Sequence, residues 1–208
     1  MTSQEFIAKY HEYGEQAKKL NELLPDYEGF QIKRGMAHSI SGFAEDLFAV
    51  YVAKKMNRKD VQFLVDKVIS VYLEGRHKAK SFKPDLAIID NNVMTHYFDM
   101  KTNLGWNRDF IGYLGEKNEF MRQLKTARPW VRFDKNNIQG LSVSEACKYQ
   151  MVVVYGDNIN QNLLKNNIEL AKQYEHVNVH VLCPKNENTG FFEMDENAFT
   201  TMEATLNS

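Results

Sequence analysis

Apolar residues recur three or four positions apart over four stretches of the chain, a spacing typical of amphipathic helices. The first stretch starts near the N-terminus and ends where Pro25 interrupts it, because proline cannot continue a helix. The second begins near Ser41, whose hydroxyl is suited to capping the first turn. The pattern predicts helices over residues 2–24, 41–57, 109–127 and 160–174.

Strand-like segments lie between these helices. Two short apolar segments, Asp85 to Asp90 and Thr95 to Lys101, are joined through Asn91-Asn92, which predicts a β-hairpin with an asparagine turn. The Val-rich run 149–155 is typical of a central strand buried on both faces, and 177–182 predicts another strand.

One segment fits both periodicities. Residues 61–73 match a helix and a strand about equally, and we expect a helical turn that gives way to a strand near Val68 to Leu73. The stretch after the third predicted helix, through Gly140, shows neither period and predicts an irregular connection. The order of elements predicts an α/β fold, with a mixed β-sheet flanked by helices on both faces.

Composition narrows the class of protein. A chain of 208 residues with 43% apolar and 25% charged residues is expected to fold as a single domain. We divide it into an N-terminal helical extension (1–40), a core (41–185) and an acidic C-terminal segment (186–208). No apolar run approaches the roughly 20 residues that span a bilayer, and the N-terminus lacks a signal-peptide pattern, so a cytoplasmic protein without membrane contact is expected.

Charge is unevenly distributed along the chain. The formal net charge is −1, which by itself argues against a basic nucleic-acid-binding protein. However, the segment 186–208 carries five acidic residues and no Lys or Arg, so the remainder of the chain is basic. Residues 75–83 contain four Lys or Arg residues and one histidine without any acid. Such runs are usually solvated surface, and their neighbours decide whether they bind a ligand.

Two aspartates flank the predicted hairpin. Asp85 follows Lys83-Pro84 and enters the first strand, whereas Asp99 lies near the end of the second, so both carboxylates can meet at one end of the pair. Paired carboxylates repel unless a hard cation lies between them, and Mg²⁺ suits carboxylate and water ligands. Lys101 lies on the same strand face as Asp99. An ammonium there could orient metal-bound water and offset charge on a phosphate, which predicts attack on a phosphodiester.

Ordinary structural roles remain open for these residues. Asp99-Met100-Lys101 is the one acid-x-lysine triplet of the sequence, but Asp99 and Lys101 could form a surface pair at a strand end. Glu45 lies on an amphipathic helix, where a surface carboxylate is common. The other Pro-Asp pair, Pro25-Asp26, follows a helix, opens no apolar strand and is interpreted as a turn.

With these residues the sequence resembles the PD-(D/E)xK nuclease superfamily, most closely a type II restriction endonuclease. The resemblance rests on Pro84-Asp85, on Asp99-Met100-Lys101 and on Gly42-Phe43-Ala44-Glu45 upstream. It implies a restriction-endonuclease-like core, with Asp85, Asp99 and the Met100 carbonyl as metal ligands. It further implies that Lys101 is the base that positions water or a residue that stabilises charge, and that Glu45 is a supporting acid and metal ligand. One departure is that Gln123 is followed four residues later by Ala127, where end-processing members often have tyrosine.

The resemblance gives the basic segments a role, because lysine and arginine hold phosphates by releasing counterions. The predicted cofactor is Mg²⁺, which Mn²⁺ could replace, and the absence of a Gly-x-x-x-x-Gly-Lys loop argues against a nucleotide cofactor. The predicted DNA contacts are Arg76, His77, Lys78, Lys80, Lys83, Trp106, Asn107 and Arg108.

Three functions are compatible with these observations. The first is a Mg²⁺-dependent endonuclease for double-stranded DNA, a type II restriction enzyme that acts as a homodimer through its N-terminal helix. The second is a structure-specific or defence nuclease of the same superfamily. The third is a non-catalytic DNA-binding protein whose carboxylates are structural.

Overall fold

The main sheet of the protein is mixed, with parallel and antiparallel pairs. In the computed structural model, residues 1–23, 40–102, 109–156, 159–186 and 188–207 are described. The sheet runs in the order β1 (Gln62–Val65), β4 (Leu86–Asp90), β5 (Val93–Lys101), β9 (Tyr149–Gly156) and β10 (Val177–Pro184), and β8 (Ser142–Val143) pairs with the start of β5. The pairs β1–β4 and β4–β5 are antiparallel, whereas β5, β9 and β10 are parallel. The predicted mixed α/β fold is confirmed at this level.

The hairpin formed by β4 and β5 turns at the two asparagines. Asn91 and Asn92 have φ angles of 50° and 66°. Two consecutive residues with positive φ match the right-handed twist of the flanking strands, and asparagine tolerates this conformation better than most residues. The predicted asparagine turn is confirmed, although β5 begins at Val93, two residues earlier than expected.

A second, antiparallel sheet corrects two of the predictions. It has the order β3 (Lys80–Phe82), β2 (Ile69–Val71), β6 (Trp130–Arg132) and β7 (Ile138–Gly140). The helical turn expected at the start of 61–73 is wrong, because β1 occupies it, whereas the strand expected near Val68 to Leu73 is confirmed as β2. The connection through Gly140 is not irregular but contains β6 and β7. Both segments become strands because partners distant in sequence supply their backbone hydrogen bonds, which local periodicity does not reveal.

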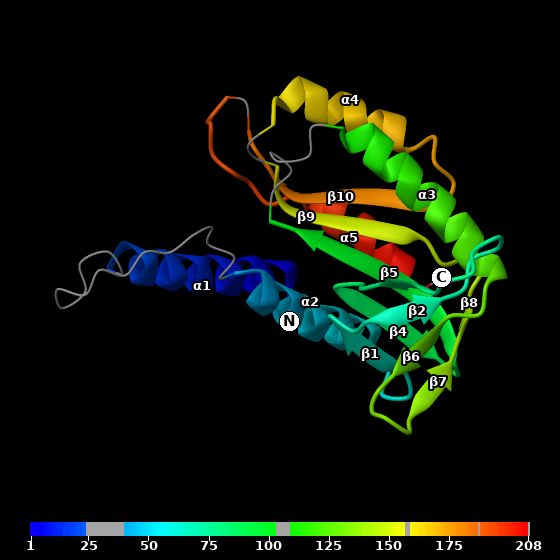
Figure 1. Cartoon of the computed structure of the whole chain (residues 1–208). Coiled ribbons are helices and arrows are strands. Elements are labelled where there is room, and N and C mark those ends of the chain that lie inside the picture. Colours follow the sequence, from blue (N-terminus) through cyan, green and yellow to red (C-terminus); the bar gives the residue numbers. More distant parts are fainter. Residues whose placement is uncertain (24–39, 103–108, 157–158, 187, 208) are drawn as a thin grey trace.

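Helices cover both faces of the main sheet, as predicted. α3 (Phe110–Thr126), α4 (Gln161–Ala171) and the second sheet pack on one face. α1 (Ser3–Leu23), α2 (Ser41–Met56) and α5 (Glu196–Ala204) pack on the other (Figure 1). The turn expected at Pro25-Asp26 lies outside the described residues. Among the described helices, none is long and apolar enough to cross a membrane.

The acidic C-terminal segment contributes to the core. α5 and the following 3₁₀ turn η2 (Thr205–Asn207) bury Phe199, Met202 and Leu206. Phe199 packs against the ring of Phe6 from α1, with centroids 6.3 Å apart. Of the two acidic side chains of α5, Glu196 is exposed, whereas Glu203 accepts a hydrogen bond from Tyr51 of α2. The charge of the segment therefore conceals a short apolar stripe.

Candidate functional site

The candidate site lies where β4 begins and β5 ends. Leu86 is paired with Phe98, so Asp85 stands opposite Asp99, one position beyond the last paired residues. The backbone N–H of Met100 donates to Oδ2 of Asp85 over 2.6 Å, and the Asp99 carboxylate is close enough to raise the pKa of Asp85. The structure therefore brings Asp85 and Asp99 together at one end of the hairpin.

Asp99 is held by three donors in the core of the site. Lys101 Nζ lies 2.6 Å from Oδ1, and the Tyr113 hydroxyl donates to Oδ2 over 3.1 Å. The Tyr149 hydroxyl donates to the same Oδ2. Burial alone would raise the pKa of Asp99, but the Lys101 charge and these hydrogen bonds outweigh it and lower the pKa below the ordinary value. Asp99 is therefore the ionised partner of the pair.

Asp85 has the opposite electrostatic character. Burial and the adjacent Asp99 carboxylate together raise the pKa of Asp85 to about 7. The Asp85 carboxyl consequently retains a proton under mildly acidic conditions. Because a metal ion binds the deprotonated carboxylate, cations and protons compete for this side chain.

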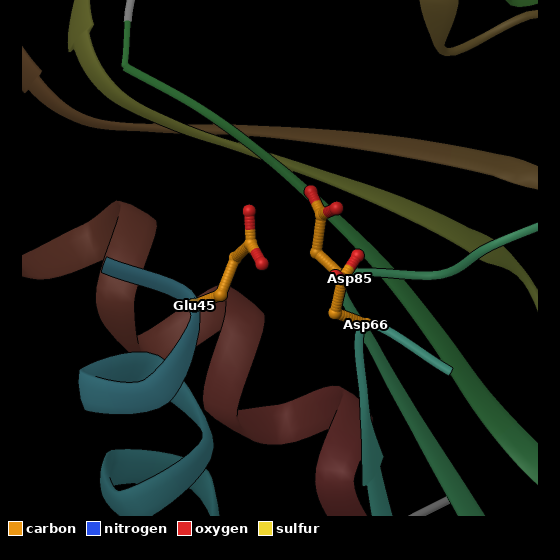
Figure 2. A group of neighbouring side chains, drawn as sticks. All are labelled: Glu45, Asp66 and Asp85. Atoms are coloured by element: carbon orange, nitrogen blue, oxygen red, sulfur yellow. The ribbon is translucent and has the colours of Figure 1, made fainter. Parts of the chain in front are cut away.

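Asp85 also belongs to a group of three carboxylates from three separate elements. One ligand oxygen from each of Glu45, Asp66 and Asp85 lies within 4.8 Å of the other two. Figure 2 shows the side chains extending toward a common space. Glu45 lies in the second turn of α2, and burial followed by the Asp66 charge raises its pKa. Opposite ligands of one Mg²⁺ ion lie about 4 Å apart, so small side-chain rotations would fit this donor set to the ion.

The sequence pattern did not identify Asp66. It follows β1, with φ of 50°, and its N–H donates to the Asp85 carbonyl over 3.1 Å. Since Val65 is paired with Leu86, Asp66 stands opposite Asp85 on the neighbouring strand. A strand prediction for 62–65, paired with the hairpin, would have placed Asp66 in the site, but the helical interpretation of this segment concealed it.

Lys101 and Glu45 line the same small hollow. It has a volume of about 120 Å³, and Ser41 and Thr102 also contribute to its wall. The Lys101 side chain is 18% exposed, so its ammonium faces the site rather than bulk water. Met100 lies between Asp99 and Lys101, and its side chain packs in the core that the main sheet forms with α1, α2 and α5. The binding of a metal ion by the Met100 carbonyl remains a prediction.

Lys117 is a second lysine near the site that the sequence pattern did not single out. Its ammonium lies over the rings of Tyr97, Tyr113 and Tyr149, at 5.8, 5.2 and 4.8 Å from their centroids. Burial lowers the pKa of Lys117, although the Asp99 charge acts in the opposite direction. The spacing of Tyr113 and Lys117 could have shown that they share one helix face. The sequence does not show which strand this helix face covers, because that depends on tertiary packing.

The predicted DNA contacts fall into three groups. Arg76, His77, Lys78 and Lys80 are exposed and line an open hollow of about 600 Å³ at the end of the second sheet. Lys83 lies nearer the carboxylates, with its Nζ 2.5 Å from Asp66. The last group, Trp106, Asn107 and Arg108, lies outside the described residues.

Comparisons with known proteins give no family for this chain. No protein-family model, no curated protein and no solved structure matches it. A functional assignment therefore rests on the geometry and chemistry of the residues described above.

Proposed function

We propose that the protein is a metal-dependent endonuclease that hydrolyses phosphodiester bonds in double-stranded DNA. The observation that carries this proposal is the convergence of Glu45, Asp66 and Asp85 within 4.8 Å, from α2 and from the ends of two paired strands. Asp99 and Lys101 stand directly beside them. Like charges gathered in this way favour a divalent cation, and a lysine beside the cation suits the charge of a phosphate.

The four carboxylates have the chemistry of a magnesium site. Glu45, Asp66, Asp85 and Asp99 would hold Mg²⁺, or Mn²⁺ in its place, because carboxylate oxygens are the hard ligands that these ions prefer. A bound ion of this kind supplies Lewis acidity and lowers the pKa of a coordinated water. The Asp99 carboxylate is already oriented, because the Tyr113 and Tyr149 hydroxyls both donate to its Oδ2.

Side chains around the carboxylates supply the remaining functions. The Lys101 ammonium would orient the attacking water and stabilise negative charge on the phosphate as a P–O ester bond breaks. Glu45 lines the same hollow as Lys101 and would accept the proton that this water releases. Lys117 adds a second positive charge beside Asp99.

The substrate part of the proposal comes from charge and from the motif resemblance. The exposed bases at 76–80 suit DNA phosphates. A restriction-endonuclease-like core, sequence-specific cutting and a homodimer belong to the same proposal. They are supported by Pro84-Asp85, Asp99-Met100-Lys101 and the glutamate-bearing helix α2. The part of the chain that the structure describes contains one such group of carboxylates, so two copies would be suited to cutting both strands symmetrically.

Plasmid cleavage with Mg²⁺ tests the proposal. We expect the wild-type protein to nick or linearise the plasmid and Lys101→Ala to be slower by about 100-fold or more. The matched control is Lys172→Ala, because Lys172 is an exposed lysine directly after α4 that is paired with Glu169. Undiminished cutting by Lys101→Ala would reject the site.

Two further outcomes separate the alternatives. Discrete fragments from a natural plasmid support a restriction enzyme, whereas a smear or cutting confined to branched DNA favours a defence or structure-specific nuclease. Absence of both nicking and Mg²⁺ or Mn²⁺ binding in isothermal titration contradicts the nuclease proposal and favours a non-catalytic DNA-binding protein.

A further inference from the structure

Two aromatic side chains lie on the outer face of the second sheet, with Tyr72 exposed and Trp130 half-buried. Ser70 of β2 is paired with Trp130 of β6, and the Tyr72 ring lies 5.2 Å from the Trp130 ring. Tyr72 is 60% exposed. The alternate residues Ile69 and Val131 are fully buried against the main sheet. Tyr72 and Trp130 are therefore a pair of rings on the side of the sheet that faces away from the core.

The same face carries further apolar and basic groups. Arg132 is paired with Ile138, and both side chains are exposed. Val68, before β2, is half exposed. Beside Trp130 a hollow of about 290 Å³ is lined by Arg128, Asn92 and Ser142 among others. The face thus combines flat apolar surfaces with nearby hydrogen-bonding groups.

Positive charge is concentrated in the segments that build this sheet. Residues 66–83 and 128–140 contain eight Lys and Arg against three Asp and Glu, although the chain as a whole has a net charge of −1. The ammonium of Lys67 lies 5.2 Å from the centre of the Phe133 ring at the edge of the face. This charge is complementary to a polyanion and disfavours a second copy of the same face.

The second sheet is connected directly to the candidate site. Asp66 precedes β2 and Lys83 follows β3, and these two residues form an ion pair of 2.5 Å at the carboxylate group. One end of the second sheet therefore lies at the carboxylate group.

We propose that the outer face of the second sheet binds a single-stranded segment of nucleic acid, with bases stacked on Tyr72 and Trp130 and phosphates held by Arg132. Exposed ring faces favour unpaired bases, because a duplex hides its base faces and presents phosphates. This deepens the proposed nuclease function, on which it rests for the role of the bound strand. The substrate would be DNA with an unpaired region beside the cut.

Binding without metal tests the inference separately from cleavage. Fluorescence anisotropy in EDTA would compare a labelled single-stranded oligodeoxynucleotide with its duplex. We expect Tyr72→Ala to weaken binding of the single strand by about tenfold or more. Arg132→Ala should weaken it and reduce its salt dependence by about one phosphate contact. Leu163→Ala is the control, because Leu163 is a half-exposed apolar residue on α4.

Tryptophan fluorescence reports the contact directly. The chain has two tryptophans, so Trp130 is the only tryptophan in a Trp106→Phe background. Saturable quenching by the single strand, reduced by Tyr72→Ala, supports a base on the Trp130 ring.

Three results would overturn the inference. The first is unchanged single-strand binding by folded Tyr72→Ala and Arg132→Ala variants. The second is binding of the duplex as tightly as the single strand, with an affinity that neither variant changes. The third is a dimer in sedimentation that Tyr72→Ala dissociates, which would assign the face to a second copy. Because these measurements need no metal, they are independent of whether the plasmid is cut.

Discussion

Asp85 and Asp99 stand opposite each other at the end of the β4–β5 pair, where each carboxyl group alters the pKa of the other. Asp99 has three donors around it, whereas Asp85 has the Met100 N–H and the Asp99 carboxylate. This asymmetry places the proton of the pair on Asp85. It also makes the metal-free site sensitive to pH.

The free energy of unfolding of the metal-free protein should fall as the pH rises from 3.8 to about 7. Asp85→Asn should remove the part of this pH dependence that comes from Asp85. The ordinary pKa of 3.8 applies to Asp85 in the unfolded chain, and about 7 in the folded one. Between these values the folded state binds more protons, so the free energy of unfolding falls by up to about 1.4 kcal/mol per pH unit. Urea unfolding at several pH values in EDTA measures the effect. Parallel pH profiles for both proteins would contradict it.

Removing the hydroxyl of Tyr149 should cost more stability than removing that of Tyr113. Tyr149 is fully buried, so Tyr149→Phe leaves an Asp99 oxygen short of a donor at a cost of about 1–3 kcal/mol. Tyr113 is partly exposed, and water can replace its hydrogen bond. The hydroxyls also lie 3.0 Å apart, so the double variant should be non-additive. Urea unfolding of the two single variants and the double variant completes the cycle. An equal loss of stability in both single variants would show that burial does not determine how much these hydrogen bonds contribute to stability.

Lys83→Met should tighten binding of Mn²⁺ severalfold. The Lys83 ammonium lies 2.5 Å from Asp66, where it competes electrostatically with a bound cation. The pair is exposed, so the substitution should change stability little. Isothermal titration would measure the affinity, with Lys172→Met as the matched lysine control and Asp66→Asn as the variant that weakens binding. Weaker Mn²⁺ binding by Lys83→Met would show that Lys83 supports the site instead.

Phe199→Ala should destabilise the whole protein by about 3–5 kcal/mol. The Phe199 ring is 1% exposed and packs edge-to-face on Phe6 and Tyr51, which joins α5 to α1 and α2. The exposed neighbour Thr200 provides a control, because Thr200→Ala should stay within about 0.5 kcal/mol of wild type. Thermal or urea unfolding distinguishes them. A small effect of Phe199→Ala would mean that the acidic segment packs only loosely.

Local signals account for the parts of the fold that were predicted. Apolar spacing located α1 to α4 within a few residues, although α4 ends at Ala171 and not at Tyr174. The asparagine pair identified the hairpin turn because Asn91 and Asn92 adopt positive φ. One strand of the second sheet, β2, was predicted, but β3, β6 and β7 were missed because they have three residues each, too few for a period to emerge. The same shortness concealed Asp66 at the end of β1.

The amino-acid sequence by itself determined the relation among Asp85, Asp99 and Lys101. A hairpin brings its two ends together within a short stretch of chain, and strand alternation puts Asp99 and Lys101 on one face. Only the tertiary structure decided that Glu45, Asp66, Tyr149 and Lys117 surround them. These residues come from elements whose packing depends on strand pairing and core burial across the whole domain. Strand pairing and core burial between distant segments leave no periodic pattern in the sequence around each of these residues.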